Sequence, residues 1–262
     1  MSKENIIRKV EYGHVDMGGP RHLYRERLIL NFVKEAKSKG HILDAGCGDG
    51  SLSIALAKYG FRVKAIDLAD GFVAMLKEKA INAHLSDCIE CQQGDITEIE
   101  FPADTFDGIV CGEVLEHMED DQRVVREFNR VLKKGGVGVV TVPINPKLWD
   151  ISDEIAGHIR RYTKKEIICL FQNNGFKIEK LHFWGFPLMW FYHKTIFILW
   201  VRMMKRKNDY ERDKSTFTKI GKNSLVSLLM ANIFKIDNLF SWLPWGIGAI
   251  LRVRKIDNLV EK

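Results

Sequence analysis

The sequence predicts an α/β protein with a mostly parallel sheet, helices on both faces of that sheet, and an apolar helical extension at the C-terminus. Two observations predict the α/β part. Short apolar segments alternate with longer helical patterns between residues 21 and 184, and glycines follow directly after the first apolar segment. Strands that alternate with helices of about ten or more residues form parallel sheets covered on both faces. A change to aromatic, apolar composition after residue 182 predicts the extension.

The expected elements follow one another in a regular order. Residues 21–39 carry apolar side chains at helical spacing, and the first strand is expected at 41–45. The other strands are expected near 62–67, 87–93, 106–111, 137–142 and 176–184, and the other helices at 51–59, 70–80 and 120–132. The run Lys133-Lys134-Gly135-Gly136 predicts a helix end, because cations stabilise the negative helix terminus and glycine adopts the left-handed turn. Thr163 and Glu166 have the spacing of a capping box, which predicts a helix from Lys164.

The turn after the first strand carries the most specific local signal. The apolar segment ends at Asp44, and Gly46, Gly48 and Gly50 then occupy alternate positions before a helix. Glycines let the backbone approach a ligand and adopt positive φ, although glycines also occur in turns that serve packing alone. Asp44 and Asp49 would repel a phosphate and attract a sulfonium or ammonium group. The glycine turn therefore favours a cationic nucleoside over a dinucleotide.

A second acid supports a nucleoside site. Asp67 ends the expected strand 62–67, about twenty residues after the glycine turn. In a Rossmann-like βαβ unit, an acid at that place reaches the two hydroxyls of a ribose. Ligands of such sheets bind outside the carboxyl ends of the strands, where Asp44, Asp95 and Gly112 also fall. The expected fold is therefore Rossmann-like, with its binding site at this edge of the sheet.

Five segments resemble, in order, the motifs of class I S-adenosylmethionine-dependent methyltransferases, in particular the ubiquinone-pathway O-methyltransferases. These segments are 43–50, 65–67, 94–96, 106–117 and 132–143. The resemblance implies S-adenosyl-L-methionine as cofactor, with Asp67 on its ribose, Asp95 and Ile96 on its adenine, and the glycine turn on its methionine portion. Arg21 or Arg27 would meet the methionine carboxylate. The cofactor-binding residues that the resemblance implies are Asp44, Ala45, Gly46, Cys47, Gly48, Asp67, Leu68, Asp95, Ile96, Cys111, Gly112 and Glu113.

Two groups of polar residues are expected on the acceptor side of the site. Glu113, Glu116 and His117 have the i, i+3, i+4 spacing of one helical face, and imidazole has an unperturbed pKa near neutrality. His117 is therefore a candidate general base, with simple packing below the cofactor as the alternative. His158 and Tyr162 follow the fifth strand, and the resemblance implies that they shape the acceptor site. We predict His117, His158 and Tyr162 as catalytic residues.

These motifs predict methyl transfer to a small-molecule or lipid-like acceptor, at oxygen. An alternative remains, because Glu113-x-x-Glu116-His117 together with His158 also resembles the metal site of small-RNA 3′-terminal 2′-O-methyltransferases, which implies a divalent ion. The net charge of +6 would fit RNA, but the cations lie beside apolar stretches and form no open basic groove. We therefore assign no metal and favour nucleic acid less. A cofactor-binding scaffold without catalysis is the third alternative, which the intact binding motifs disfavour.

The extension is expected over residues 183–262, and the methyltransferase domain over residues 1–182. Five of the six tryptophans lie between residues 184 and 245. A helical stripe of Leu225, Leu229, Ile233, Ile236 and Phe240 is continued by 242–251, and the flanking cations are Arg202, Lys205, Arg206, Lys207, Arg252, Arg254 and Lys255. This combination is typical of segments that lie on an anionic membrane. A substrate cap or a homodimer contact are the alternatives, whereas His193 and Lys194 argue against a transmembrane span.

Composition places the chain among globular proteins of a reducing compartment. Its 262 residues, 46% of them apolar, suffice for a full core. The cysteines number five, and Cys47 and Cys111 fall in expected buried segments, so reduced thiols are expected. Cys88 and Cys91 form a Cys-x-x-Cys pair, but no second pair follows, which disfavours a zinc site. The N-terminus is polar and charged and has no signal-peptide pattern, so we predict a cytoplasmic protein, peripheral at the inner face of the membrane.

Overall fold

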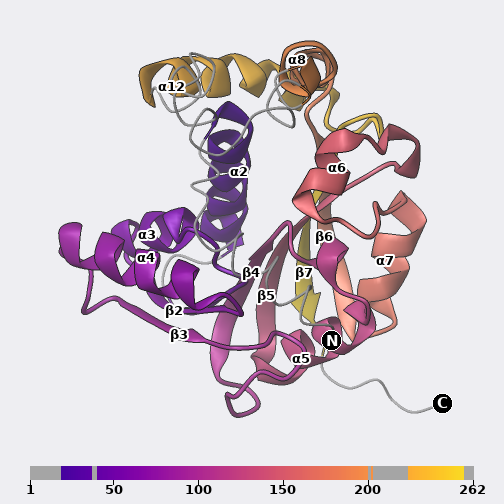
Figure 1. Cartoon of the computed structure of the whole chain (residues 1–262). Coiled ribbons are helices and arrows are strands. Elements are labelled where there is room, and N and C mark those ends of the chain that lie inside the picture. The colour runs from indigo at the N-terminus through magenta and orange to yellow at the C-terminus, as the bar shows by residue number, and fades with distance from the viewer. Residues whose placement is uncertain (1–18, 37–39, 200–201, 203–223, 257–262) are drawn as a thin grey trace.

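The computed structural model describes residues 19–36, 40–199, 202 and 224–256, and it contains one seven-stranded sheet between helices (Figure 1). The strand order is β3-β2-β1-β4-β5-β7-β6. The strands are β1 (His41–Ala45), β2 (Arg62–Asp67), β3 (Ile89–Gln93), β4 (Phe106–Gly112), β5 (Leu132–Pro143), β6 (Phe176–Trp184) and β7 (Gly248–Lys255). The sheet confirms the expected α/β class and the first six strands in their expected order.

The helices connect these strands and form the layers around them. They are α2 (Pro20–Ala36), α3 (Ser51–Lys58), α4 (Asp70–Asn82), α5 (Asp121–Val131), α6 (Ile151–Ala156), α7 (Lys164–Gln172), α8 (Leu188–Tyr192) and α12 (Ser224–Ile233). Short turns complete them: the 3₁₀ segments η1 (Leu115–His117), η2 (Pro146–Leu148) and η4 (Phe234–Phe240), and the π-helical segment η3 (His193–Phe197). The helix α7 begins with the expected capping box, in which Thr163 and Glu166 bond each other's backbone N–H.

The first five strands run parallel, and β7 is antiparallel to both β5 and β6. We expected 242–251 to continue a helical stripe, and this expectation is wrong from Gly248 onward. The side chains of Leu251 and Val253 enter the core, while Arg252 and Arg254 point outward and bind Glu179. This period of two is the pattern of a half-buried strand. The expected domain boundary at 182/183 therefore assigns β7 to a different domain from the sheet in which it pairs with β5 and β6.

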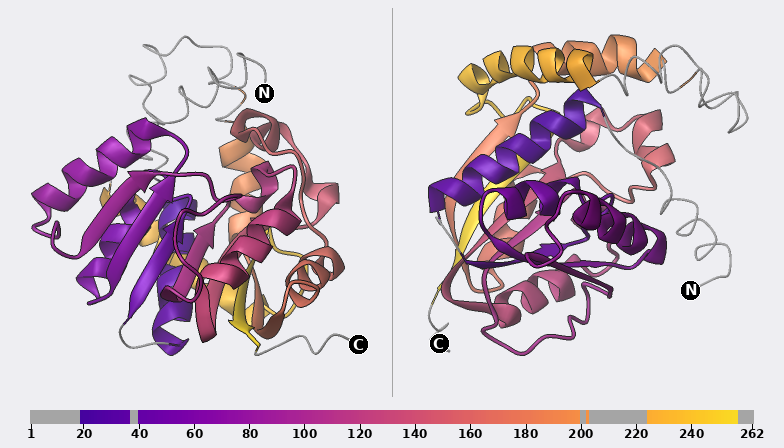
Figure 2. Two further views of the ribbon diagram at one scale, coloured as in Figure 1. Left: turned by 90° about the horizontal axis from the view of Figure 1, so that it is seen from below. Right: turned by 90° about the vertical axis from the view of Figure 1, so that its left-hand side faces the viewer.

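The two faces of the sheet are covered by different helices (Figure 2). On one face α2, α3 and α4 bury side chains such as Phe32, Leu56 and Leu76 against the sheet. On the other face α5 and α7 do the same with side chains such as Phe128 and Phe171. Alternate residues of each strand supply the two cores, as the pleat of a strand requires. This packing fixes the carboxyl ends of the strands relative to the helices that follow them.

The helix α2 lies between the sheet and a layer formed by α8, α12 and η4 (Figures 1 and 2). The hydroxyl of Tyr24 donates to Oδ1 of Asn238 over 2.6 Å. Arg27 donates to Asn232 of α12 over 3.4 Å. Asp237 of η4 is buried and accepts from the backbone N–H groups of Leu188 and Met189. These bonds attach the C-terminal helices to α2, so this layer is part of the same packed body.

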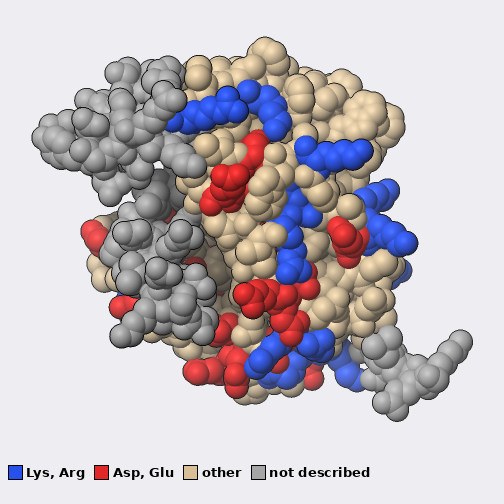
Figure 3. Space-filling model, turned by 45° about the vertical axis from the view of Figure 1, so that its right-hand side comes forward, with Lys and Arg blue, Asp and Glu red and all other residues tan. Residues whose placement is uncertain are grey.

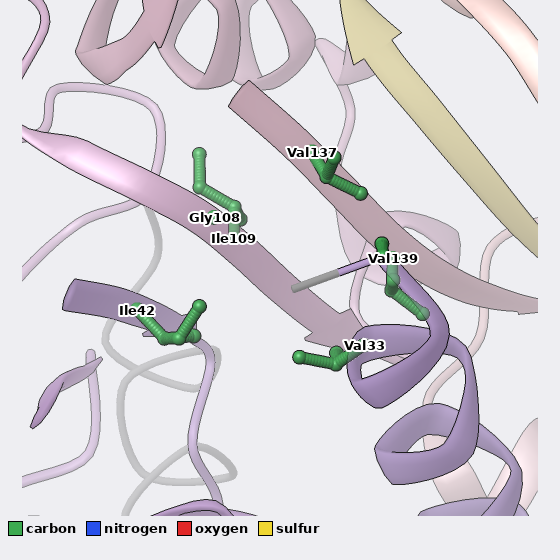
Figure 4. A pocket seen from close by; sticks show the side chains of 7 residues that line it. Val33, Ile42, Gly108, Ile109, Val137 and Val139 are labelled. Carbon is green, nitrogen blue, oxygen red and sulfur yellow. The ribbon is translucent and has the colours of Figure 1, made fainter. Parts of the chain in front are cut away.

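A small apolar cavity lies between the C-terminal half of α2 and the sheet (Figure 4). Its walls are aliphatic and include Val33, Ile42, Ile109, Val137 and Val139. The cavity measures about 10 Å³, about the minimum for one ordered water, and its lining is apolar, as in a packing defect of the core.

No described helix is both long and apolar enough to cross a bilayer. The expected cations Lys205, Arg206 and Lys207 lie outside the described residues.

Candidate active site at the carboxyl edge of the sheet

The expected site residues gather where the parallel strands end. The strand order reverses at β1 and β4, because the chain moves outward from β1 through β2 to β3 and then returns to β4 on the other side. Such a switch point leaves a crevice at the carboxyl ends of the two central strands. The glycine turn follows β1, Asp67 ends β2, and Gly112 ends β4. The fold therefore brings together the three segments that the sequence singled out.

The glycines of the turn serve two different purposes. Gly46, Gly48 and Gly50 have φ values of 78°, 51° and 78°, in the left-handed region. A Cβ on Gly46 would lie 2.6 Å from Val114, and one on Gly50 would lie 2.5 Å from Leu76, so these two positions are closed by packing. A Cβ on Gly48 would meet no atom of the described residues within 4 Å. Gly48 is therefore the position where the turn opens onto space that a ligand can fill.

Asp67 is tied to the glycine turn by its own side chain. Its Oδ2 atom accepts from the backbone N–H of Gly48 over 2.9 Å, and its Oδ1 atom accepts from Ala69 over 3.0 Å. Leu68 is exposed beside it. The structure thus places the expected ribose acid at the open position of the turn.

The expected adenine contacts lie after β3. Asp95 is exposed, and its Oδ1 atom accepts from the backbone N–H and the hydroxyl of Thr97, each over 2.8 Å. Ile96 is buried in the core. The backbone N–H of Gly94 donates to the carbonyl of Asp67 over 3.0 Å, so this segment is attached to the end of β2. Asp95 therefore stands next to the ribose acid.

The two acids flanking the turn contribute less negative charge than we expected. Asp44 is buried and accepts from the Ser53 hydroxyl over 2.6 Å, and burial raises the pKa of Asp44 to about 7. Asp49 binds Nζ of Lys79 over 2.8 Å. Burial raises the pKa of Asp49, but the hydrogen bonds from Lys79 and Ser51 outweigh it and hold the pKa below its ordinary value. The expectation that Asp44 and Asp49 repel a phosphate and attract a sulfonium is therefore weakened, because burial raises the pKa of Asp44 and Lys79 neutralises Asp49.

The segment after β4 differs from the helix that the spacing of Glu113, Glu116 and His117 predicted. Glu113 has a φ of 58°, and only Leu115–His117 form a 3₁₀ turn. The left-handed residue breaks the helical spacing, and the next residue, Val114, lies against Gly46 of the neighbouring turn. Glu116 is fully buried. Burial, followed by the negative charge of Glu113, raises the pKa of Glu116 well above its ordinary value.

Arg25 of α2 is a site residue that we did not expect. Its Nη1 atom lies 3.7 Å from Oε2 of Glu113. Arg27 instead contacts α12, and Arg21 bonds His193, so neither of the two expected arginines lies closest to Glu113. The signal was present in the sequence, since residues 21 and 25 are four apart and share one helical face.

His158 is held in a defined orientation by a buried carboxylate. Its Nδ1 atom lies 2.8 Å from Oδ1 of Asp153, and its Nε2 atom lies 3.7 Å from Oε1 of Glu116. Burial raises the pKa of Asp153, but the bond from His158 and the charge of Arg161 hold it below its ordinary value. The capping box at the start of α6 holds Asp153, and the left-handed Gly157 ends α6 directly before His158.

His117 lies beside His158 and Glu116. The two imidazole rings meet edge to face with centroids 4.9 Å apart, and His117 Nδ1 lies 3.1 Å from the carbonyl of Gly157. One donor atom from each of Glu116, His117 and His158 falls within a 4.8 Å cluster. The structure therefore brings together three of the four residues considered for a divalent ion. Glu113 is instead directed to Arg25.

Tyr162 has a different environment from the one predicted for a catalytic residue. It is buried, and its hydroxyl lies 2.8 Å from Asp121 Oδ2 and 3.1 Å from the carbonyl of Leu115. Burial, followed by the bond to Asp121, raises the pKa of Tyr162 well above its ordinary value. The hydroxyl of Tyr162 is thus engaged inside the core, and its predicted catalytic role stays a prediction.

The cysteines near the site are thiols in the core. Cys47 and Cys111 are buried and free, and burial raises the pKa of both well above the ordinary value. Ala45 and Gly112 contribute backbone beside them. Cys88 and Cys91 are free as well, and neither joins a cluster of metal-ligating side chains among the described residues. These residues can line the site but do not supply a nucleophile.

Several buried polar atoms around the crevice lack a hydrogen-bond partner within the described structure. They are Nε of Arg25, Oε1 of Glu113, and both carboxyl oxygens of Glu116. Buried polar groups normally have partners, so a cluster of unpartnered atoms indicates a missing ligand. An aminoacyl group with its ammonium and carboxylate would match the acid and the arginine. Together with the open position at Gly48 and the acid Asp67, this set fits a nucleoside that carries an amino acid.

Part of the chain is similar to known methyltransferases. Residues 43–140 match the family described as "Methyltransferase domain". A ubiquinone biosynthesis O-methyltransferase of Coxiella burnetii is 36% identical over 118 residues, which cover 45% of this chain and 50% of that protein. The chain thus spans about half the length of the curated relatives it matches.

Solved structures of similar fold include two named methyltransferases. A putative sarcosine dimethylglycine methyltransferase from Galdieria sulphuraria has a TM-score of 0.64 at 18% identity, covering 90% of this chain and 86% of that one. Phosphoethanolamine N-methyltransferase 2 of Haemonchus contortus, solved with S-adenosyl-L-methionine, has a TM-score of 0.58 at 18% identity, covering 88% and 53%. At these identities the neighbours show the fold. The family match adds that residues 43–140 of this chain are similar to a methyltransferase domain.

Proposed function

We propose that the protein transfers a methyl group from S-adenosylmethionine to an oxygen atom of a small-molecule or lipid-like acceptor. The observation that carries this proposal is the bond between His158 and Asp153 at the carboxyl edge of the sheet. A carboxylate only accepts hydrogen bonds, so His158 Nδ1 carries the proton and Nε2 presents its lone pair. An imidazole held in this way can take the proton of an acceptor hydroxyl.

The cofactor, when bound, supplies a methyl group on a sulfonium. The residues proposed to hold it are those of the crevice: Asp67 for the ribose hydroxyls, Asp95 and Ile96 for the adenine, and Gly48 for close approach of the backbone. Arg25 and Glu113 would meet the charged groups of its methionine portion, which matches their unpartnered atoms. The main task of the protein is then to align the acceptor with the methyl group and to remove the acceptor proton.

Cofactor binding and methyl transfer are tested separately. Calorimetric titration with S-adenosylmethionine tests the site, and absence of binding would leave only the scaffold alternative. Radiolabelled S-adenosylmethionine, incubated with a lipid extract and in parallel with a water-soluble extract of bacterial cells, tests the transfer. We expect label in an extractable lipid-like product, and no label with His158→Gln. Label confined to the water-soluble fraction would contradict the lipid-like acceptor.

We further propose that an apolar helical surface places the protein on an anionic membrane. This surface consists of exposed apolar side chains of α8, η3, α12, η4 and the turn that follows: Leu188, Phe191, Ile196, Leu199, Leu225, Leu228, Leu229, Ile233, Ile236, Leu239, Phe240, Trp242 and Trp245. The stripe expected from helical spacing therefore faces outward, with Trp242 73% exposed. Figure 3 shows this end of the molecule nearly free of charge, with basic side chains below it. That order suits the interface of an anionic bilayer.

Vesicle sedimentation tests the membrane proposal. Wild-type protein should sediment with phosphatidylglycerol vesicles, less so with phosphatidylcholine vesicles, and release at high salt. The double variant Trp242→Ser/Trp245→Ser should remain in the supernatant. Ile81→Ser is the matched control, because Ile81 is 64% exposed on α4, outside this surface. A wild-type protein that stays in solution with vesicles but forms a dimer, which the tryptophan variant abolishes, would assign the surface to a second copy.

The RNA 2′-O-methyltransferase remains a second candidate, because Glu116, His117 and His158 bring donor atoms within 4.8 Å of one another. A carboxylate and two imidazoles are suitable ligands for a divalent ion, and such ligands must be deprotonated to bind it. Activity that EDTA abolishes and magnesium or manganese restores, on a short RNA with a free 3′ end, would favour this candidate. Activity on a lipid-like acceptor that resists EDTA would exclude it.

A further inference from the structure

The guanidinium of Arg21 lies beside the candidate site without a carboxylate partner among the described residues. Its Nη1 atom lies 2.8 Å from Nδ1 of His193, and its Cζ atom lies 4.7 Å above the ring of Phe197. Arg21 is half-buried, and burial lowers its pKa to about 10 against the attraction of the Glu113 carboxylate, so the group is still charged at neutral pH. A desolvated cation normally has an anionic partner, because an unpaired charge is costly to bury.

His193 does not neutralise this charge. The imidazole is buried, and its Nε2 atom lies 3.0 Å from Oδ2 of Asp150. Asp150 can only accept, so Nε2 carries the proton, and Nδ1 accepts from Arg21. Burial lowers the pKa of His193 to about 4, which keeps the ring neutral. His193 is therefore a positioning residue that holds one edge of the guanidinium and adds no negative charge.

The charges around Arg21 are paired with one another. Arg25 lies 3.7 Å from Glu113, Arg161 lies 2.9 Å from Asp153, and Lys194 lies 2.8 Å from Asp150. Glu116 forms no ion pair with Arg21; its Oε1 atom lies 3.7 Å from Nε2 of His158, and burial raises its pKa well above the ordinary value. One positive charge remains after these pairs are formed. It is the charge on Arg21.

We propose that Arg21 binds an anionic group, a carboxylate or a phosphate, carried by the methyl acceptor. This inference rests on the proposed methyl transfer, which it narrows to acceptors with an oxyanion near the methylated oxygen. A guanidinium presents several N–H donors in one plane and matches both oxyanions. His193 and Phe197 hold the group from one edge and one face, which leaves the rest of the fork for a ligand.

The cofactor's own carboxylate is the competing anion. Arg25 suits it better, because Arg25 lies against Glu113 and has an unpartnered Nε, and His22 on the same helix lies 3.8 Å from Asp49 of the glycine turn. Arg21 precedes Arg25 by one helical turn, or roughly 6 Å along α2. It bonds His193, which follows α8, and not the glycine turn. Arg21 is thus placed on the acceptor side of Arg25.

The test measures anion binding to the protein already saturated with S-adenosylhomocysteine, whose carboxylate then occupies the cofactor site. Benzoate and inorganic phosphate are titrated, followed by calorimetry and by the NMR signals of the arginine guanidinium groups. We expect at least one of them to bind. Arg21→Gln should weaken that binding at least tenfold and leave the affinity for S-adenosylhomocysteine within twofold. Arg21→Lys should retain part of the binding, which separates loss of charge from loss of fold.

Arg27→Gln is the matched control, since Arg27 lies on the same helix but contacts Asn232 of α12. It should bind both anions as the wild type does. Equal weakening by Arg27→Gln, or no anion binding by the saturated wild type, would overturn the proposal. A tenfold loss of S-adenosylhomocysteine affinity in Arg21→Gln would reassign the guanidinium to the cofactor carboxylate. If the wild type bound no S-adenosylhomocysteine, the methyl-transfer proposal would fail, and the anion titration of the ligand-free protein would still decide the role of Arg21.

Discussion

The Nδ1 atom of His158 lies 2.8 Å from Oδ1 of Asp153, and the Nε atom of Arg161 binds both oxygens of the same carboxylate, over 2.9 and 3.0 Å. The carboxylate is buried and also accepts from the backbone N–H of Asp150. The Asp153 carboxylate is therefore held from three sides, and its bond to Nδ1 holds the His158 imidazole in turn. A base held so closely loses little entropy when it meets the acceptor.

The first prediction concerns this base. Replacing His158 by Gln should lower kcat by about 10²–10⁴-fold, the usual contribution of a general base, with little change in cofactor affinity. Steady-state kinetics with the acceptor that the radiolabel experiment finds measures the change in kcat. The matched control is His84→Asn, an exposed histidine between α4 and β3, which should keep full activity. A fully active His158→Gln together with an inactive His117→Gln would transfer the role to His117.

The second prediction concerns Asp67. Asp67→Ala should weaken the binding of S-adenosylmethionine by about 1–3 kcal/mol, because the ribose hydroxyls and the N–H of Gly48 lose a charged acceptor. Calorimetric titration measures the change. Asp70→Ala, an exposed acid three residues later, should bind as the wild type does. Unchanged affinity in Asp67→Ala would mean that the ribose lies elsewhere.

Much of the cofactor half of the site could be predicted from sequence, because it depends on local order. A strand, a glycine turn and a helix in succession place the turn at the strand end, and parallel pairing of β1 and β2 then brings Asp67 next to Gly48. The acceptor half depends on contacts between distant segments. Arg21 meets His193 across 172 residues, and no spacing within either segment encodes that contact.

The strand β7 shows a different limit. A short apolar run after a helical stripe predicts a continuation of the helix, since periodicity alone cannot distinguish a buried strand from a helix over so few residues. The alternation of Leu251, Arg252, Val253 and Arg254 was the available signal.

The helix expected through Glu113 is absent for another reason. Glu113 has a left-handed φ of 58°, and the spacing of the polar residues does not encode that conformation.

The third prediction uses the two glycines that differ in their surroundings. Gly46→Ala should destabilise the fold by about 1–3 kcal/mol, because its Cβ would meet Val114 at 2.6 Å and φ is 78°. Gly48→Ala meets no atom and should cost about 1–2 kcal/mol from its positive φ alone. Its methyl group would, however, occupy the ligand space. Thermal unfolding and S-adenosylmethionine titration should therefore show the larger loss of affinity, relative to lost stability, in Gly48→Ala. The reverse order would place the ligand away from the turn.

The last prediction follows from the buried carboxyl of Asp44, whose pKa burial raises to about 7. Its unfolded pKa is about 3.9, so between these values the folded state holds a proton that the unfolded state has lost. Stability must then fall as pH rises, by about 1.4 kcal/mol per pH unit at most from this group, and level off above pH 7. Asp44→Asn keeps an oxygen for the Ser53 hydroxyl but cannot ionise. Urea unfolding from about pH 4 to pH 8 should therefore show Asp44→Asn gaining stability over the wild type as pH rises, while the exposed control Asp70→Asn shows no such trend.

A sulfonium bound near Asp44 would favour its ionised form, so wild-type protein should also release protons on binding S-adenosylmethionine near pH 6, and Asp44→Asn should release fewer. Parallel unfolding curves for Asp44→Asn and the wild type would mean that Asp44 is ionised in the fold, and the glycine turn would then carry the negative charge that its sequence suggested.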